Sequence, residues 1–168
     1  MSTDGARGPA VRPQLVAIDV DDTLLEDDLS LRPECVEAIA LAREQGVRIV
    51  LATGRMYRSV RPIAERLGLD GYLITYNGGL VRSMAGETLW HRPVPQALIP
   101  PLIDIAREEG VCLNLYVDDT LYVESAEDER VRYYVQIAGV EAVEVGDIRV
   151  AARRGESTKC LLVGEADQ

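Results

Sequence analysis

Two aspartates, Asp19 and Asp21, follow the first apolar run of the 168-residue chain, Leu15–Ile18. If the backbone stays extended there, residues two positions apart point the same way, and two carboxylates that close repel each other. Either a cation then lies between them or one of them stays protonated. An ionised Asp can attack phosphorus, a protonated one can act as a general acid, and a pair can hold Mg²⁺. The alternative is a solvated acidic loop, which the preceding strand and the following Thr23-Leu24 disfavour.

Further polar groups follow two later apolar runs. Thr53-Gly54-Arg55 comes after residues 47–52, and Asn77-Gly78-Gly79 comes after residues 72–76. In open α/β sheets, ligands bind beyond the carboxyl ends of the strands, so one crevice can collect carboxylates, a hydroxyl, a guanidinium and an amide. The glycines by themselves are a weak phosphate-loop signal, because glycine after a strand is ordinary turn chemistry.

The elements that must position these groups alternate between strand and helix. Apolar runs and helical spacing predict strands at 15–18, 47–52 and 72–76, and helices at 33–45 and 57–67. The first strand is expected to be buried, and the first helix is expected to place Val36, Ile39, Ala40 and Arg43 on one face. Right-handed crossovers then give a parallel sheet with helices on its faces, an α/β fold.

The second half of the chain has a different order of predicted strands and helices. The pattern predicts a hairpin at 79–83 and 88–92, a helix at 99–109, a hairpin at 111–117 and 120–124, a helix near 131–138 and a strand at 158–163. Hairpins mixed with helices indicate an α+β unit. We therefore expect one part at 15–82 and a second at 83–168. Residues 1–14 are polar and are expected to form a disordered tail rather than a signal peptide.

Composition excludes several classes of function. The formal net charge of -10 argues against nucleic-acid binding, which needs a basic field. No apolar run approaches the roughly 20 residues of a membrane span, so no membrane partner is expected. The cysteines Cys35, Cys112 and Cys160 are far apart and form no zinc or disulfide pattern. Reduced cysteines of this kind favour a cytoplasmic protein.

Three motifs carry a resemblance to a known family. Residues 19–25, DVDDTLL, resemble the DxDxT motif of the haloacid dehalogenase superfamily. Residues 51–55, LATGR, resemble the ATGR motif of its Cof-type phosphatases, and residues 74–79, ITYNGG, resemble the NGA-like element that comes next in those proteins. The resemblance covers residues 14–168 and implies a partial Rossmann-like core with a partial inserted α+β cap. It also implies an Mg²⁺-dependent phosphatase of small phosphorylated metabolites such as sugar phosphates.

The resemblance assigns a role to each matching residue. Asp19 is expected to be the nucleophile and a metal ligand. Asp21 is expected to protonate the leaving group, then activate water, and to bind the metal through its backbone carbonyl. Thr53 and the N–H of Gly54 are expected to hold the transferring phosphoryl group.

Other positions are assigned less directly by the resemblance. Arg55 and Asn77 are expected to orient the substrate or a metal-bound water. Asp22 stands where the family often has Gly, and its extra charge either tightens metal binding or hinders phosphate binding.

The family also uses a lysine after the cap and a later acidic motif. Lys159, the only lysine, is one candidate for that lysine, but it begins an apolar strand of the kind found inside such caps, which we favour. Asp118-Asp119 is one candidate for the acidic motif, but Thr-Leu-Tyr-Val follows at once, and we favour a hairpin turn. The chain is therefore expected to be incomplete and to have little phosphatase activity alone.

The leading hypothesis is a phosphatase that acts through an aspartyl-phosphate. A non-catalytic binding or regulatory remnant of the same scaffold is one alternative, and a phosphomutase, which passes the phosphoryl group to another hydroxyl, is a second. A partial sheet also has an exposed edge, so self-association is expected.

Overall fold

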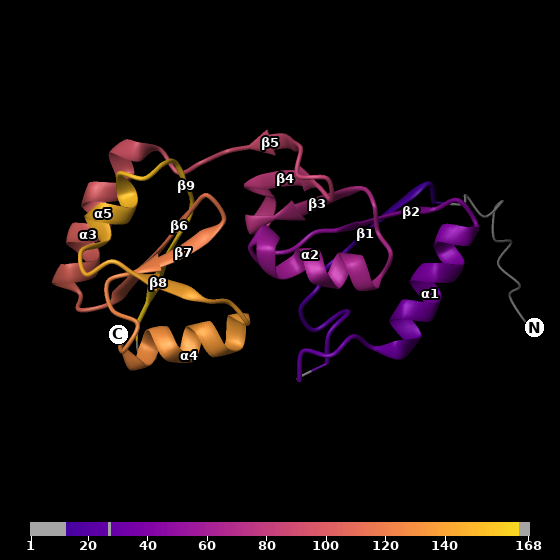
Figure 1. The fold of residues 1–168 in the computed structure, drawn as a ribbon, viewed down its shortest axis with the longest axis horizontal. Helices are drawn as coiled ribbons and strands as arrows, with labels where there is room; N and C mark the ends of the chain where they lie inside the picture. Colours follow the sequence, from indigo (N-terminus) through magenta and orange to yellow (C-terminus); the bar gives the residue numbers. More distant parts are fainter. Residues whose placement is uncertain (1–12, 27, 165–168) are drawn as a thin grey trace, which may run out of the picture.

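The strands and helices alternate as the sequence predicts as far as residue 75. The structure, a computed structural model, describes residues 13–26 and 28–164; most of the predicted tail lies outside them. The first elements are β1 (Leu15–Ile18), α1 (Pro33–Glu44), β2 (Arg48–Leu51), α2 (Tyr57–Arg66) and β3 (Tyr72–Thr75). They form the right-hand part of Figure 1.

The three strands run parallel, which confirms the predicted α/β class. β1 pairs with β2 along its whole length, from Leu15 opposite Arg48 to Ile18 opposite Leu51. A parallel bridge between Ala52 and Ile74 joins β2 to β3. Because the strands share one direction, the residues that come after each of them meet at the same edge of the sheet.

The predicted hairpin, β4 (Leu80–Ser83) and β5 (Thr88–His91), belongs to the same sheet as β3. Its first strand pairs antiparallel with β3, Thr75 lying opposite Leu80. The division expected near residue 82 stays a prediction. Since the pairing ties the hairpin to β3, we propose that the second part begins after β5, beyond residue 91.

The second part is a four-stranded sheet between helices. Its elements are α3 (Ile99–Glu108), β6 (Cys112–Val117), β7 (Thr120–Val123), α4 (Glu129–Ala138), β8 (Ala142–Glu144), α5 (Ile148–Ala152) and β9 (Ser157–Val163), with strand order β8-β7-β6-β9. The sequence pattern did not predict β8 and α5, because elements of three and five residues are too short to show a periodicity.

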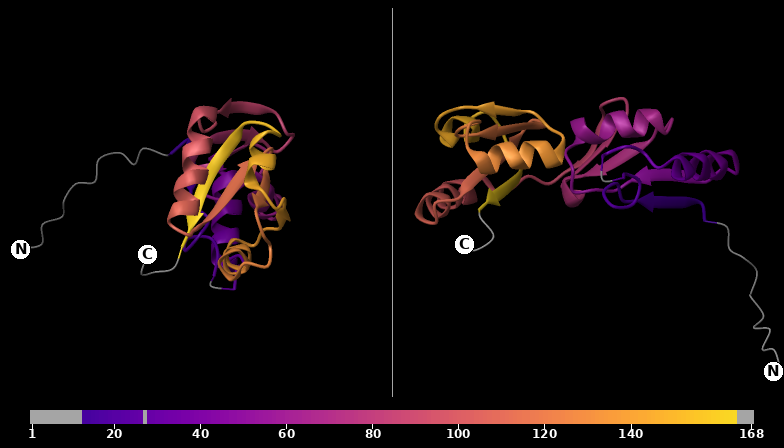
Figure 2. Two further views of the ribbon diagram at one scale, coloured as in Figure 1. Left: turned by 90° about the vertical axis from the view of Figure 1, so that its left-hand side faces the viewer. Right: turned by 90° about the horizontal axis from the view of Figure 1, so that it is seen from below.

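The two faces of this sheet are covered by different helices (Figures 1 and 2). Alternate residues of β6 point to opposite faces. Leu115 packs with Ile103 of α3 and Ile148 of α5 in one apolar cluster, whereas Tyr116 belongs to the cluster that contains Val131 of α4. The face that bears Tyr116 is therefore the one covered by α4.

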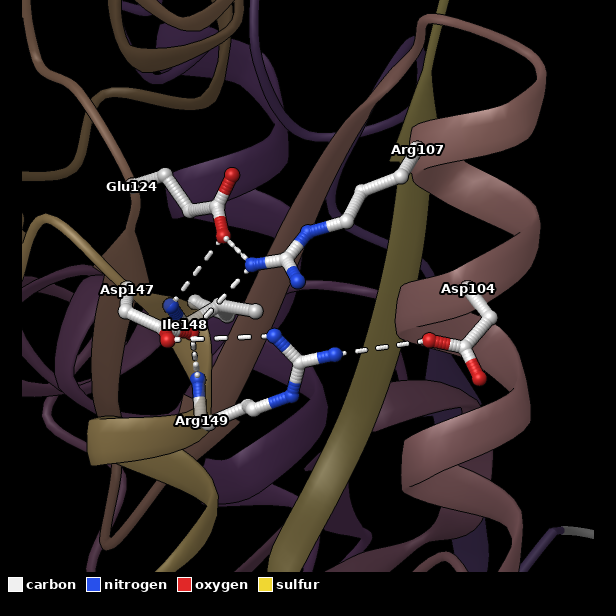
Figure 3. Close-up of polar contacts among 6 residues, drawn as sticks. All are labelled: Asp104, Arg107, Glu124, Asp147, Ile148 and Arg149. Carbon is white, nitrogen blue, oxygen red and sulfur yellow. Dashed lines mark hydrogen bonds and ion pairs between the residues drawn. The ribbon is translucent and has the colours of Figure 1, made fainter.

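A network of ion pairs joins α3, the end of β7 and the start of α5 (Figure 3). Arg107 contacts Glu124 at 2.9 Å and Asp147 at 3.3 Å, and Arg149 contacts Asp104 at 3.4 Å. Asp147 also caps α5 by accepting a hydrogen bond from the backbone N–H of Arg149. Exposed pairs of this kind stabilise a fold little individually, so the network mainly fixes how the short α5 sits.

The expected burial of the first strand is wrong. β1 was expected to be buried, yet Leu15 is 54% exposed and Ala17 is exposed. In α1 only Ile39 of the predicted face is buried, and Ala40 is exposed. Within the described residues, no other strand pairs with the outer edge of β1, and Val16 and Ile18 are only partly buried against the core.

We propose that the free edge of β1 causes self-association, because its unpaired N–H and C=O groups can bind another strand. We expect sedimentation velocity to show oligomers that increase with protein concentration. Ala17→Lys places a charge on this edge and should restore a monomer, whereas the control Ala40→Lys adds the same charge on exposed α1 and should not. A folded monomer at every concentration would contradict the proposal.

Within the described residues, no helix is both long and apolar enough to cross a membrane.

Candidate active site

The loop after β1 turns sharply instead of continuing as a strand. The backbone N–H groups of Leu24 and Leu25 both donate to the carbonyl of Val20, at 3.0 and 3.2 Å. The backbone is therefore not extended from Asp19 to Asp21, and the two side chains are not required to point the same way. Asp19 itself is exposed, and its Oδ1 accepts a hydrogen bond from the N–H of Val20 at 2.8 Å.

Asp22 is the residue of this turn with a left-handed backbone conformation. Its φ is +55°, in the left-handed region that glycine adopts most easily and that Asp tolerates better than most residues. A backbone requirement thus explains why glycine suits this position, and the charge of Asp22 needs no separate explanation there.

The loops after β2 and β3 are bound to each other through their backbones. The N–H of Asn77 donates to the carbonyl of Thr53 at 3.1 Å, and the N–H of Tyr76 donates to the carbonyl of Arg55 at 2.9 Å. Both Tyr76 and Asn77 have positive φ, +53° and +55°, which this close pairing holds in place. Gly54 suits this close approach, because a Cβ there would lie 2.8 Å from Oδ1 of Asn77 and the exposed Asn77 side chain would have to move.

The predicted residues line two neighbouring cavities rather than one. Asp19 and Thr53 line a cavity of about 480 Å³ at the ends of β1 and β2. Asp21 and Arg55 line another of about 380 Å³. Gly54 and Asn77 line both, so the two cavities are adjacent.

Asp21 forms an ion pair with Arg55. The guanidinium contacts Asp21 through Nε at 2.9 Å and through Nη2 at 2.5 Å, and its Nη1 donates to the carbonyl of Ala138 at the end of α4. The Arg55 side chain is only 12% exposed. Arg55 therefore holds Asp21 and contacts the second part at the same time.

Other contacts between the two parts were not predicted from the sequence. The hydroxyl of Tyr76 donates to Oδ1 of Asp119 at 2.7 Å, and Arg58 of α2 lies 3.5 Å from Oγ1 of Thr120. Burial raises the pKa of the Asp119 carboxyl. The sequence pattern carries no signal for this contact, because Tyr76 and Asp119 lie 43 positions apart in the chain.

The predicted turn at Asp118-Asp119 is confirmed. Both residues have positive φ, +48° and +57°, and they join the antiparallel strands β6 and β7. This is the backbone geometry of a two-residue hairpin turn, for which Asp is suited. Lys159 lies in β9, the last strand of the second part, and its assignment to a cap stays a prediction.

The site offers oxygen donors for a hard cation. The carboxylate of Asp19 is exposed, and the backbone carbonyl of Asp21 follows it in the same loop. Mg²⁺ commonly takes one or two carboxylates and completes its shell with water and substrate phosphate, so this donor set fits it. The part of the chain that the structure describes contains no group of three or more acidic, His or Cys side chains able to hold a metal ion.

Comparison with known proteins finds relatives that are named as phosphatases. The pyridoxal phosphate phosphatase YbhA of Escherichia coli strain K12 is 32% identical over 112 residues, which are 66% of this chain and 41% of the relative. The HMP-PP phosphatase of Serratia proteamaculans strain 568 is 28% identical over 148 residues, 88% of this chain and 54% of the relative. The chain thus spans about half the length of these curated relatives, or less.

Solved structures share the fold. A haloacid dehalogenase-like hydrolase from Bacteroides thetaiotaomicron superposes with a TM-score of 0.82 at 26% identity and covers 92% of this chain and 59% of its own. A subclass IIB sugar phosphatase superposes with a TM-score of 0.69 at 19% identity over 85% of this chain and 56% of its own. The sequence model of one family, the haloacid dehalogenase-like hydrolases, matches residues 16–164. The chain therefore belongs to the haloacid dehalogenase-like hydrolase family.

Proposed function

We propose that this chain carries the nucleophile and the phosphate-binding loop of a phosphomonoesterase that acts on small phosphorylated metabolites. One observation carries the proposal: the exposed carboxylate of Asp19 lines the same cavity as Thr53 and Gly54, at the carboxyl ends of β1 and β2. The relatives named as phosphatases of pyridoxal phosphate and HMP-PP, and the sugar phosphatase among the structures, support this substrate class.

The proposed reaction has two steps. A carboxylate oxygen of Asp19 attacks phosphorus, the ester bond to the leaving oxygen breaks, and Asp21 gives that oxygen its proton. Water, deprotonated by Asp21, then attacks the aspartyl-phosphate and releases phosphate. Thr53 Oγ1 and the N–H of Gly54 hold the phosphoryl oxygens. In the structure Asp21 is ion paired with Arg55. For the first step Arg55 must therefore release the carboxyl group and Asp21 must carry a proton, which it regains from water in the second step.

Mg²⁺, held by the carboxylate of Asp19 and the backbone carbonyl of Asp21, would neutralise negative charge on the phosphoryl group. Charge compensation of this kind commonly contributes more to catalysis than any other single effect. The described residues contain no group of three or more acidic, His or Cys side chains able to hold a metal ion. We therefore expect the chain by itself to be slow.

The test measures phosphate release from a panel of sugar phosphates, pyridoxal phosphate and 4-nitrophenyl phosphate, with Mg²⁺ and with EDTA. It uses the chain and a fusion that continues the chain with the remaining part of the Escherichia coli relative. We expect Mg²⁺-dependent release that is faster in the fusion. Binding without turnover in both proteins would favour a non-catalytic scaffold, and transfer to a second sugar without phosphate release would favour a phosphomutase.

A further inference from the structure

The cavity that contains Asp21 lies between the two parts of the chain. From the first part it is lined by Asp21, Arg55 and Asn77, and from the second by Tyr116, Tyr134 and Lys159. Its volume of about 380 Å³ suits a small ligand. The residues of the second part have no role in the proposed phosphoryl transfer.

Lys159 reaches this cavity because of strand register. In the antiparallel pairing of β9 with β6 it lies opposite Tyr116, so both side chains point to the face of the sheet that α4 covers. Its Nζ donates to the carbonyl of Gly54 at 3.4 Å and lies 5.5 Å from the centre of the Tyr116 ring. The ammonium thus lies beside the loop that contains Gly54, in the cavity that Asp21 lines.

The charge of Lys159 lacks a counter-charge within the part of the chain that the structure describes. Among those residues, no carboxylate lies within ion-pair distance of its Nζ. Burial lowers the pKa of the ammonium, and no neighbouring charge opposes that shift. A partly buried cation without a counter-charge is unfavourable, and an anion bound beside it would remove the cost.

The two tyrosines add a hydrogen-bond donor at the same place. The hydroxyls of Tyr116 and Tyr134 are hydrogen bonded to each other. Two hydroxyls carry two protons and this bond uses one, so the pair can donate the other to an acceptor in the cavity.

We propose that Lys159, with the Tyr116–Tyr134 pair, binds a second anionic group on the leaving part of the substrate, a carboxylate or a second phosphate. The inference rests on the proposed function. The transferring phosphoryl group belongs in the adjacent cavity with Asp19 and Thr53, whereas Lys159 shares its cavity with Asp21, which serves the leaving oxygen. The preferred substrates are therefore phosphate esters with a further negative charge.

The test compares two ligands of equal carbon number, 3-phosphoglycerate, which has a carboxylate, and glycerol 3-phosphate, which has a hydroxymethyl group instead. Dissociation constants are measured by isothermal titration calorimetry on the whole chain with Mg²⁺. We expect tighter binding of 3-phosphoglycerate by about 10-fold, the effect of one charge-assisted hydrogen bond. Lys159→Met should abolish the preference, and Lys159→Arg should keep part of it.

The control Arg153→Met removes the same charge from an exposed position outside this cavity and should leave the preference unchanged. Melting curves check that each variant is folded. Equal binding of the two ligands by the unsubstituted chain, or a preference that survives in Lys159→Met, overturns the inference. Tighter binding of 3-phosphoglycerate without any hydrolysis supports the inference and contradicts the proposed function. Hydrolysis without that binding preference supports the proposed function and contradicts the inference.

Discussion

Asp19→Asn is expected to lower phosphate release by on the order of 10³-fold or more, because an amide cannot attack phosphorus and the covalent step has no substitute nucleophile. The measurement is Mg²⁺-dependent phosphate release, in the chain and in the fusion with its relative. The substitution is nearly isosteric, and Asn can still accept the hydrogen bond from the N–H of Val20. The loss should therefore come without a change in melting temperature.

Asp70→Asn is the matched control, since Asp70 is exposed and lies before β3, at the opposite edge of the sheet. It should retain full activity. Mass spectrometry of protein quenched during turnover should find the added phosphoryl group on the peptide that contains Asp19. Turnover by Asp19→Asn within 10-fold of the unsubstituted protein would refute the assignment of the nucleophile.

Asp21→Asn should have an effect that depends on the leaving group. A general acid contributes roughly 10²- to 10⁴-fold, and it matters most when the departing oxygen needs a proton. We expect the first turnover to slow by about 10²-fold or more with a sugar phosphate. With 2,4-dinitrophenyl phosphate, whose leaving group departs as a stable anion, the slowing should be less than about 10-fold. Rapid-quench measurement of the first turnover isolates this step from hydrolysis of the intermediate.

The variant Arg55→Lys tests whether Asp21 acts as a general acid or only holds Arg55 in position. It keeps the positive charge beside Asp21 but loses the two-point contact of the guanidinium. If Asp21 mattered only through its anchor to Arg55, both variants would slow the two substrates equally. A leaving-group dependence in Asp21→Asn that is absent in Arg55→Lys would support proton transfer.

The sequence by itself located most of the first part and its loops. Apolar runs ending in Asp19, Thr53 and Asn77 predicted parallel strands, and parallel strands bring the residues after their carboxyl ends to one edge of a sheet. The turn at Asp118-Asp119 could also be predicted from the sequence, because its backbone geometry depends on only two residues. The ends of strands and the geometry of tight turns depend mainly on residues adjacent in the sequence, so the sequence pattern predicts them.

Only the tertiary structure decided how the groups are shared between the two cavities. The turn that begins at Val20 places the side chains of Asp19 and Asp21 in different cavities. Backbone hydrogen bonds stabilise this turn, and the periodicity of the sequence does not predict them. Lys159 reaches the loop of Gly54 because β9 pairs with β6 in one register, and a shift by one residue would turn its side chain to the other face. Sequence patterns specify which residues are apolar and where strands end, whereas contacts between distant segments depend on packing and register. For that reason the sequence indicated which loops meet at one edge of the sheet but not how their side chains are arranged.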